Sequence, residues 1–408
     1  MGMAWDVFGN GKTAIKANLS KYWQSANNEA NYTIANRAAT FAQTTTRSWT
    51  DGNNNKVPDC NLANRDLQDN RATGGDLCGR WDNQNFGSIV SATTINPDVL
   101  EGWGVRPYDW QFGASLQQEL LPRVSAELAY SRRSWGNFFY TDNRAVGPQD
   151  YDTLTITVPT HPSLPTSGQQ ASYKLIKESG FGRVDNYYTF ASDYGDVTSY
   201  WQGVDLTVNA RMNNGLTMQG GFSTGGGIRD TCEINDKLPE VLGSQQIASC
   251  NVEEQWLWNW RGLANYVVPK VDVQVSAILR SQANTSPGGG IASNGASLSA
   301  NYAVSNAMVL AALGRPIAGS GANTTVDLTL PGELYADRVN SVDMRFAKIL
   351  RFGRTRTNVG IDLYNLLNAN TGTAFNQTFD PLTNGSSWLR PTQILNPRFL
   401  RFNVTVDF

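Results

Sequence analysis

Long hydrophobic runs are missing from this sequence of 408 residues. Ala307–Leu313 is among the longest apolar stretches, whereas a transmembrane helix needs about 20 consecutive apolar residues. The first residues, Met1–Trp5, contain neither a basic region nor an apolar segment, so we expect no signal peptide in this sequence. A membrane-spanning function would therefore have to use β-strands.

Charge and catalytic side chains are also scarce. Charged residues make up 17% of the chain and the net charge is −2, so neither nucleic acid nor an anionic lipid surface is an expected partner. The single histidine, His161, lies beside Pro159 and Pro162, and we expect it to be a solvated loop residue. No nucleophile motif, phosphate-binding loop or Cys/His cluster is present. We therefore expect no enzyme and no required cofactor.

The four cysteines form two pairs with the same spacing, Cys60 with Cys78 and Cys232 with Cys250. This spacing fits two disulfides, each local to one loop, although four cysteines allow three pairings. Disulfides indicate an oxidising compartment outside the cytosol. Because an exported chain normally begins with a signal peptide, we expect the start of this sequence to be truncated.

Residues 397–408 show the clearest regular pattern, because apolar and polar side chains alternate with a period of two. This period is typical of a β-strand. One face carries Leu400, Phe402, Val404, Val406 and Phe408. The opposite face carries only polar or charged residues, Arg401, Asn403, Thr405 and Asp407. In a soluble sheet the apolar face would meet a core, and in an outer-membrane barrel it would meet lipid.

Ten further segments have strand-like patterns, and they are joined alternately by short turns and long polar stretches. The expected strands are Met3–Phe8, Thr13–Trp23, Trp110–Glu119, Val124–Trp135, Tyr200–Met212, Leu216–Ser223, Gln255–Val268, Val271–Arg280, Arg338–Leu350 and Thr357–Leu366. The short turns lie at Asn10, Pro122, Asn214, Lys270 and Arg354. Transmembrane barrels show this asymmetry, with tight periplasmic turns and long extracellular loops.

We therefore predict an all-β fold, an antiparallel transmembrane β-barrel with about 11–12 strands. Eleven strands are half of 22, the number in plugged outer-membrane transporters, whereas one more strand at residues 324–330 would give an even total. Tryptophans at strand ends fit an aromatic girdle: Trp23, Trp103, Trp110, Trp135, Trp201, Trp256, Trp258 and Trp260. Charged residues expected to line the lumen are Asp205, Asp272, Asp343, Asp362, Asp407, Arg211, Arg280, Arg345 and Arg401.

Four segments, Ala4–Ala14, Gly332–Asn340, Asp343–Phe346 and Phe352–Asn368, resemble the C-terminal barrel of TonB-dependent receptors. The resemblance covers essentially the whole chain and is greatest for the Oar-like subgroup, which has a carboxypeptidase-regulatory-like domain. It implies a receptor or transporter barrel of the cell outer membrane, surrounded by lipid, that takes up an unknown ligand. It also implies a terminal aromatic strand that the barrel assembly machinery recognises, and coupling to an inner-membrane energy complex through the plug. Residues 1–408 would be the C-terminal part of that barrel, with plug, signal peptide and first barrel half absent.

One loop resembles a calcium-binding loop of the thrombospondin type 3 and EF-hand kind. Asp51, Asn53, Asn55 and Asp59 place oxygen-bearing side chains at relative positions 1, 3, 5 and 9, and Val57 offers its carbonyl at position 7. Lys56 stands where such loops usually have glycine, so a calcium site here would be weak. The alternative interpretation is a surface turn rich in Asn and Asp.

Two other functions remain open on the sequence. One is a complete small porin or adhesin barrel in the same membrane. The other is a secreted β-rich carbohydrate-binding protein, which the many Trp and Tyr residues favour.

Overall fold

The computed structural model describes residues 1–25, 42–88, 93–284 and 297–408. Its regular structure is almost entirely β. Within the described residues the α-helices are the short α2 (Pro97–Leu100), α3 (Cys232–Lys237) and α4 (Asn306–Leu313). None of the helices in this part of the chain is long and apolar enough to cross a membrane.

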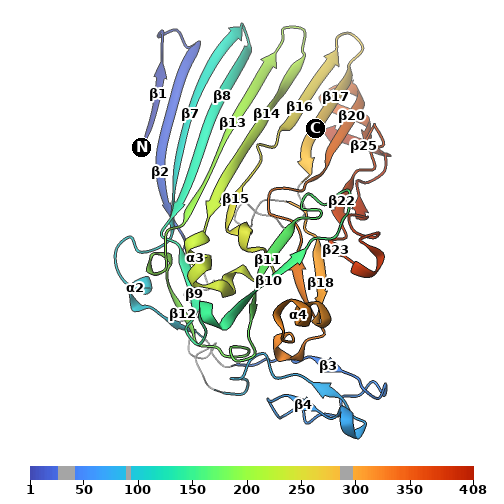
Figure 1. Cartoon of the computed structure of the whole chain (residues 1–408). Helices are drawn as coiled ribbons and strands as arrows, with labels where there is room; N and C mark the ends of the chain where they lie inside the picture. Colours follow the sequence, from blue (N-terminus) through green and yellow to red (C-terminus); the bar gives the residue numbers. More distant parts are fainter. Residues whose placement is uncertain (26–41, 89–92, 285–296) are drawn as a thin grey trace.

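A single large antiparallel sheet organises the chain (Figure 1). Eleven strands pair in chain order, and the short β15 (Asn251–Glu253) adds a twelfth by pairing with β14. The eleven strands are β1 (Gly2–Asp6), β2 (Thr13–Trp23), β7 (Tyr108–Leu121), β8 (Val124–Gly136), β13 (Thr198–Arg211), β14 (Thr217–Asp230), β16 (Asn259–Val268), β17 (Val273–Asn284), β20 (Ala336–Phe352), β21 (Thr355–Tyr364) and β25 (Phe399–Asp407). The antiparallel all-β prediction is therefore confirmed.

The short turns of this sheet lie together at one end, at the top of Figure 1. At the first turn, the Asp6 carboxylate accepts hydrogen bonds from the backbone nitrogens of Gly9 and Gly11, both of which have positive φ. Arg123 and Lys270 adopt positive φ at two other turns. These turns are tight because residues with left-handed backbone reverse the chain over a few positions.

The strand register gives the sheet two chemically different faces. Paired residues in an antiparallel ladder point to the same side, and alternate residues point to opposite sides. Leu206 therefore shares a face with Leu128 and Phe222, its partners in β8 and β14. We call this the apolar face. Asp205, Arg261 and Arg280 lie on the other, the polar face. Asp272 was expected there too, but it lies in the turn between β16 and β17 with positive φ.

The long connections fold together at the opposite end of the sheet (Figure 1). We name their described residues the loop cap: 42–88, 93–107, 137–197, 231–258, 297–335 and 365–398. The described residues of the loop cap contain five small sheets. Three of them have three strands each: β3 (Trp49–Thr50), β5 (Leu77–Cys78) and β4 (Gln68–Asp69); β6 (Thr93–Ile95), β12 (Asn186–Phe190) and β9 (Phe139–Asn143); and β19 (Asn323–Asp327), β18 (Asn301–Ser305) and β23 (Thr378–Phe379). The other two are pairs, β10 (Tyr151–Thr157) with β11 (Gln170–Ile176) and β22 (Gly372–Phe375) with β24 (Pro391–Ile394). Two of these sheets contain strands from different connections.

The loop cap also contains the largest buried apolar cluster. All fourteen buried residues of this cluster come from three cap segments, including the fully buried Leu154, Val304, Val309, Leu328 and Phe379. The strand expected at residues 324–330 does form, as β19, but it pairs with β18 inside the cap and not with the large sheet. Val326 of β19 (Asn323–Asp327) and Leu328, which follows this strand, point into the cap core, which explains that placement.

Candidate functional site

The apolar face of the large sheet is exposed along its full width. Each of the eleven strands contributes a large apolar side chain that is more than a third exposed: Trp5, Leu19, Phe112, Leu128, Val208, Met218, Trp260, Leu279, Phe346, Ile361 and Phe402. Phe402, at 76%, is the extreme of this set. A soluble monomer rarely exposes a continuous apolar surface of this extent, because burial of such area is the main stabilising contribution to folding. A surrounding apolar phase would cover it.

Aromatic residues cluster on this face where the strands approach the loop cap. The Phe222 ring lies 5.0 Å from the rings of both Trp258 and Trp260. The Lys21 ammonium lies 3.8 Å from the Tyr108 ring and 4.2 Å from the Trp23 ring. Rings with a polar edge or a neighbouring cation suit the boundary between lipid and water.

Two tryptophans assigned to this girdle from the sequence lie elsewhere. Trp135 pairs with Asp109, and Trp201 pairs with Arg133, so both belong to the polar face. Both lie near strand ends, as expected, but alternate residues of a strand point to opposite faces, and these two point to the polar face. The girdle prediction was therefore wrong for Trp135 and Trp201.

The polar face carries paired charges. Arg133 Nε lies 2.8 Å from Asp109 Oδ2. On the same face, near the edge strand β25, Asp362 Oδ2 accepts hydrogen bonds from Arg401 and Asn403, each at 2.9 Å. Asp362 is almost fully buried, so these donors replace the water that its carboxylate oxygens lose. The mixed-charge lining expected from the sequence is present on this face.

Cross-contacts between connections make the loop cap one folded body. Tyr173 donates from its hydroxyl to the Asp327 carbonyl at 2.8 Å, and burial raises the pKa of that hydroxyl. Arg315 Nε contacts Asp152 Oδ2 at 2.6 Å, and this hydrogen bond lowers the pKa of Asp152. The Trp388 indole donates to the Ser299 carbonyl at 2.9 Å. Each of these contacts joins residues more than 80 positions apart.

His161 belongs to the same body. Its ring packs edge-on against Phe379 and Trp388, with ring centres 5.6 and 5.4 Å apart. His161 does lie in a loop, as expected, but its ring is partly buried by these aromatic side chains. The aromatic partners come from a connection more than 200 residues later, so the neighbouring prolines could not reveal them.

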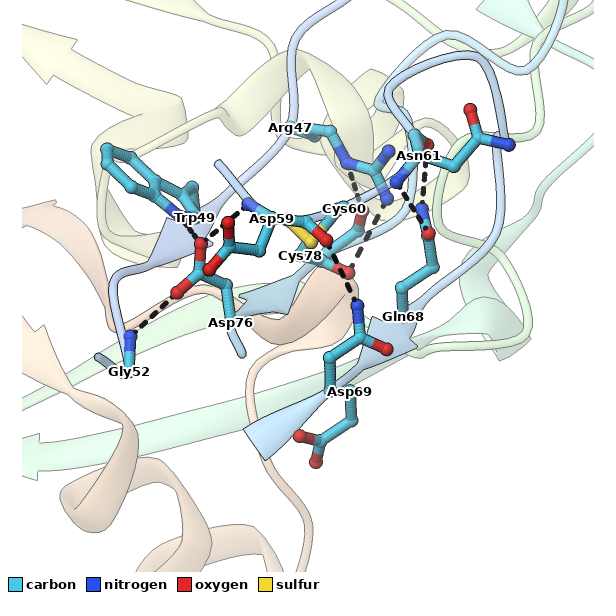
Figure 2. Close-up of a disulfide and its surroundings, with 12 residues drawn as sticks. Arg47, Trp49, Gly52, Asp59, Cys60, Asn61, Gln68, Asp69, Asp76 and Cys78 are labelled. Carbon is cyan, nitrogen blue, oxygen red and sulfur yellow. Dashed lines mark hydrogen bonds between the residues drawn. A yellow bond between two sulfur atoms is a disulfide. The ribbon is translucent and has the colours of Figure 1, made fainter. Parts of the chain in front are cut away.

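The disulfide between Cys60 and Cys78 fixes the first part of the cap (Figure 2). Beside it, the buried Asp76 carboxylate accepts hydrogen bonds from the Asp59 nitrogen, the Trp49 indole and the Gly52 nitrogen, at 2.8 to 2.9 Å. These donors lower the pKa of Asp76, the Asp59 amide most. The sequence indicated the cysteines, whereas the central role of Asp76 was missed.

The second disulfide, Cys232–Cys250, closes the connection that contains α3. Cys250 also accepts a backbone hydrogen bond from Thr231 at 2.9 Å. Both bridges join cysteines 18 residues apart and stay within one connection. Of the three pairings that four cysteines allow, the structure has the loop-local one.

The residues suggested for calcium form a compact turn. Asp51 accepts from the backbone nitrogens of Asn55 and Lys56, at 3.2 and 2.9 Å, and the side-chain amides of Asn53 and Asn55 both reach Asp59. Lys56 adopts the positive φ for which calcium loops use glycine. Four oxygen-bearing side chains are thus close together. The Val57 backbone N–H donates a hydrogen bond to Asn55 Oδ1 at 2.7 Å.

This turn contains only two carboxylates. Among the residues that the structure describes, no three His, Cys, Asp or Glu side chains form a group able to hold a metal ion. The donor set is therefore the weakly charged one that the sequence indicated. Calcium binding at Asp51–Asp59 stays a prediction.

Solved outer-membrane proteins overlay on almost the whole of this chain. The outer membrane transporter YddB from Escherichia coli overlays with a TM-score of 0.47 and 10% identity, over 99% of this chain and 39% of that chain. The ferripyoverdine receptor of Pseudomonas aeruginosa gives 0.41 and 10%, over 99% and 32%. The siderophore receptor PirA from Acinetobacter baumannii gives 0.39 and 10%, over 99% and 40%. This chain spans less than half the length of each. No protein-family model matches the chain, and no curated sequence matches it.

Proposed function

We propose that this chain forms part of the wall and the external loops of a TonB-dependent receptor in a bacterial outer membrane, which takes up a ligand. The carrying observation is the combination of a continuous exposed apolar face with five short turns at one end and a folded loop cap at the other. Lipid would cover the apolar face, and the cap would meet the ligand outside the cell.

The edges of the sheet support the view that the wall contains further strands. Within the described residues, β1 pairs with β2 and β25 pairs with β21, and the two edge strands do not pair with each other. Unpaired backbone groups in lipid cost several kcal/mol each, so a membrane sheet must close. We propose that strands of a first barrel half close it, giving about 22 strands as in plugged transporters. The plug of such a receptor would couple it to the inner-membrane energy complex.

Two rival functions make different demands on the same features. A complete small porin or adhesin would require β1 and β25 to meet, with no other strands between them. A secreted carbohydrate-binding protein would require the apolar face to tolerate water. The exposed apolar side chains in all eleven strands favour a membrane protein over the soluble alternative.

The orientation of the turns provides the test. Single cysteines at Asn10, Pro122 and Lys270, in otherwise cysteine-free protein expressed in the outer membrane, should resist a membrane-impermeant maleimide in whole cells. A cysteine at Asn70, in the loop cap, should react. Lysed cells provide the control, because all four positions should then be labelled. Equal labelling of both sets in intact cells would contradict the proposed membrane orientation.

A further inference from the structure

Two basic side chains lie on the apolar face of the large sheet. Lys21 in β2 pairs with Trp110 in β7, and Arg132 in β8 pairs with Phe112 in β7. Phe112 belongs to the exposed apolar set and Trp110 is two residues before it, so the strand register places both cations on the apolar face. β2, β7 and β8 are neighbouring strands (Figure 1). Lipid that covers this face would therefore meet two cations within three adjacent strands.

Both cations lie near the strand ends that meet the loop cap. Lys21 is two residues before the end of β2 at Trp23, and Arg132 is four residues before the end of β8 at Gly136. Arg132 is exposed and Lys21 is half-buried. The aromatic cluster of the apolar face lies at the same level, where hydrocarbon gives way to lipid headgroups.

Aromatic rings hold these two cations in place. The Lys21 ammonium lies 3.8 Å from the centre of the Tyr108 ring and 4.2 Å from that of the Trp23 ring. The Arg132 guanidinium carbon lies 4.3 Å from the centre of the Tyr200 ring. A ring face attracts a cation but leaves its net charge in place. Within the part of the chain that the structure describes, neither cation forms an ion pair with a carboxylate.

Another basic residue on the apolar face shows the contrast. Lys348 pairs with Val273 near the short turns, and its ammonium donates a hydrogen bond to the Val271 carbonyl. A charge that faces lipid is costly unless a partner compensates it. The apolar-face residues of β2, β7 and β8 include no acidic side chain. An anion for Lys21 and Arg132 would therefore come from outside these strands.

Neutral polar side chains beside the two cations add hydrogen-bond donors. Ser134 shares its cross-strand row with Lys21 and stands two residues after Arg132 in β8. Gln202, in β13, pairs with Arg132. The Gln202 side-chain oxygen accepts a hydrogen bond from the Tyr130 hydroxyl at 2.9 Å, which leaves the amide nitrogen as a donor. We name Lys21, Arg132, Ser134 and Gln202 the basic patch.

We propose that the basic patch binds the phosphate of a lipid in the outer leaflet. Phosphate oxygens accept strong, charge-assisted hydrogen bonds from ammonium and guanidinium groups. A lipid fits this place because its acyl chains would cover Phe112 and Leu128, which are exposed on the same face further toward the short turns. The inference goes beyond ligand uptake, and it rests on the proposed membrane orientation for the leaflet that the patch meets.

Photo-crosslinking in intact cells tests the proposal. A benzophenone amino acid at Ser134, in the chain expressed in the outer membrane, should form an adduct with a phosphate-bearing lipid on illumination, identified by mass spectrometry. The same amino acid at Leu128, six residues earlier in β8 and on the same face, reports lipid contact away from the patch. Lys21→Gln combined with Arg132→Gln should lower the Ser134 adduct at least about fivefold per assembled chain, because the attraction to phosphate is lost. The Leu128 adduct should stay unchanged.

Two further double variants control for charge and for packing. Lys16→Gln with Arg280→Gln removes the same charge from the polar face and should leave the Ser134 adduct unchanged. Lys21→Arg with Arg132→Lys keeps the charge of the patch and should retain the adduct, which a role in ring packing alone would not predict.

Either of two results would overturn the phosphate site. One is an equal Ser134 adduct in the two glutamine double variants, and the other is a Ser134 adduct that contains no phosphate. Absence of lipid adducts at Ser134 and Leu128 alike would contradict the lipid-facing wall together with the patch. A failure confined to Ser134 leaves the result of the cysteine-labelling test unaffected, so the two proposals fail separately.

Discussion

The Trp49 indole donates a hydrogen bond to Asp76 across 2.8 Å, although the two residues are 27 positions apart in the chain. Asp76 also accepts from the backbone nitrogens of Gly52 and Asp59, so one carboxylate connects both ends of the segment beside the Cys60–Cys78 bridge (Figure 2). Buried polar groups that satisfy several partners at once fix one arrangement of a loop with little apolar core. The order of this segment should therefore depend on the charge of Asp76.

The first prediction concerns pH. The hydrogen bonds to Asp76 lower its pKa in the folded state below the ordinary 3.8. The stability it contributes is therefore complete above pH 3.8 and is lost as the pH falls through the lower folded value. Amide hydrogen exchange in residues 49–78 should accelerate several-fold at acid pH relative to the rest of the cap.

Asp76→Asn should produce the same acceleration at neutral pH, because it removes the charge while keeping the size. Asp66→Asn is the control, since Asp66 is exposed in the same segment. If Asp66→Asn and Asp76→Asn exchange alike at neutral pH, Asp76 is not the organising group.

The second prediction joins the Cys60–Cys78 bridge to calcium. A bridge that closes a loop of this length contributes about 3 kcal/mol of ordering in the chain-entropy account. It would lower the cost of gathering Asp51, Asn53, Asn55 and Asp59 around a cation. Calcium should therefore slow proteolysis of residues 51–78, and reduction should diminish this protection.

The connection closed by Cys232 and Cys250 supplies the comparison, because it should respond to reduction and not to calcium. Asp59→Ala should abolish the calcium effect without breaking the bridge. Cleavage of residues 51–78 at the same rate in calcium and in a chelator would identify this segment as an ordinary Asx-rich turn.

The third prediction tests the apolar face. Val275 pairs with Phe346 and Tyr266 on that face, whereas its neighbour Gln274 lies on the polar face and contacts Asn265 at 2.7 Å. Val275→Arg and Val404→Arg should each destabilise the membrane-inserted protein by about 2–4 kcal/mol near the bilayer midplane. Gln274→Arg should be mild, because its guanidinium stays hydrated. The fraction of each variant that assembles in the outer membrane measures the difference, and equal assembly of all three variants would mean that these strands do not face lipid.

The fourth prediction separates the loop cap from the sheet. Phe379 is fully buried and contacts His161, Tyr302 and Trp388. Phe379→Ala should cost the cap about 3–5 kcal/mol through the lost apolar contacts and the cavity that remains. The cap segments should then be cleaved faster by protease while the strands stay protected. Leu382→Ala, three residues away and 94% exposed, should change neither.

The fifth prediction follows from the sheet edges. The purified chain carries unpaired backbone groups along β1 and β25, so it should aggregate, close imperfectly or require further strands. Size-exclusion chromatography with light scattering in detergent reports the outcome. A monodisperse, heat-stable monomer that conducts ions would show a complete small barrel and would remove the half-barrel proposal.

The large sheet was predictable because its determinants are local. Alternation along Tyr200–Met212 and the Asn213–Gly215 turn depend only on neighbouring residues, and β13 and its turn form as expected. The prediction ended β14 at Ser223, whereas the strand continues to Asp230. The extension contains Gly225–Gly227, and glycine lowers strand propensity on its own. In the structure the rings of Trp201 and Trp256 pack against these glycines, and the sequence does not indicate that contact.

The loop cap was much less predictable, because its core is assembled from three connections. Leu154, Ile156 and Val158 alternate with polar residues, which is a strand pattern inside a stretch that the sequence analysis predicts to be a long connection. Nothing local indicates that they pack against Val326 and Phe379. Contacts between residues far apart in the sequence leave no signal in composition or period, and for the same reason the role of Asp76 could not be inferred from the sequence.

The shared core of the cap has a consequence for recognition by antibodies. A binding protein that approaches this end of the molecule meets a folded surface to which several distant stretches contribute side by side, as β18 and β23 do. Antibodies raised against the native protein should therefore recognise discontinuous epitopes, and synthetic peptides from any one stretch should compete poorly for them. Escape from such an antibody by a single change at the surface would leave the buried cluster beneath it intact.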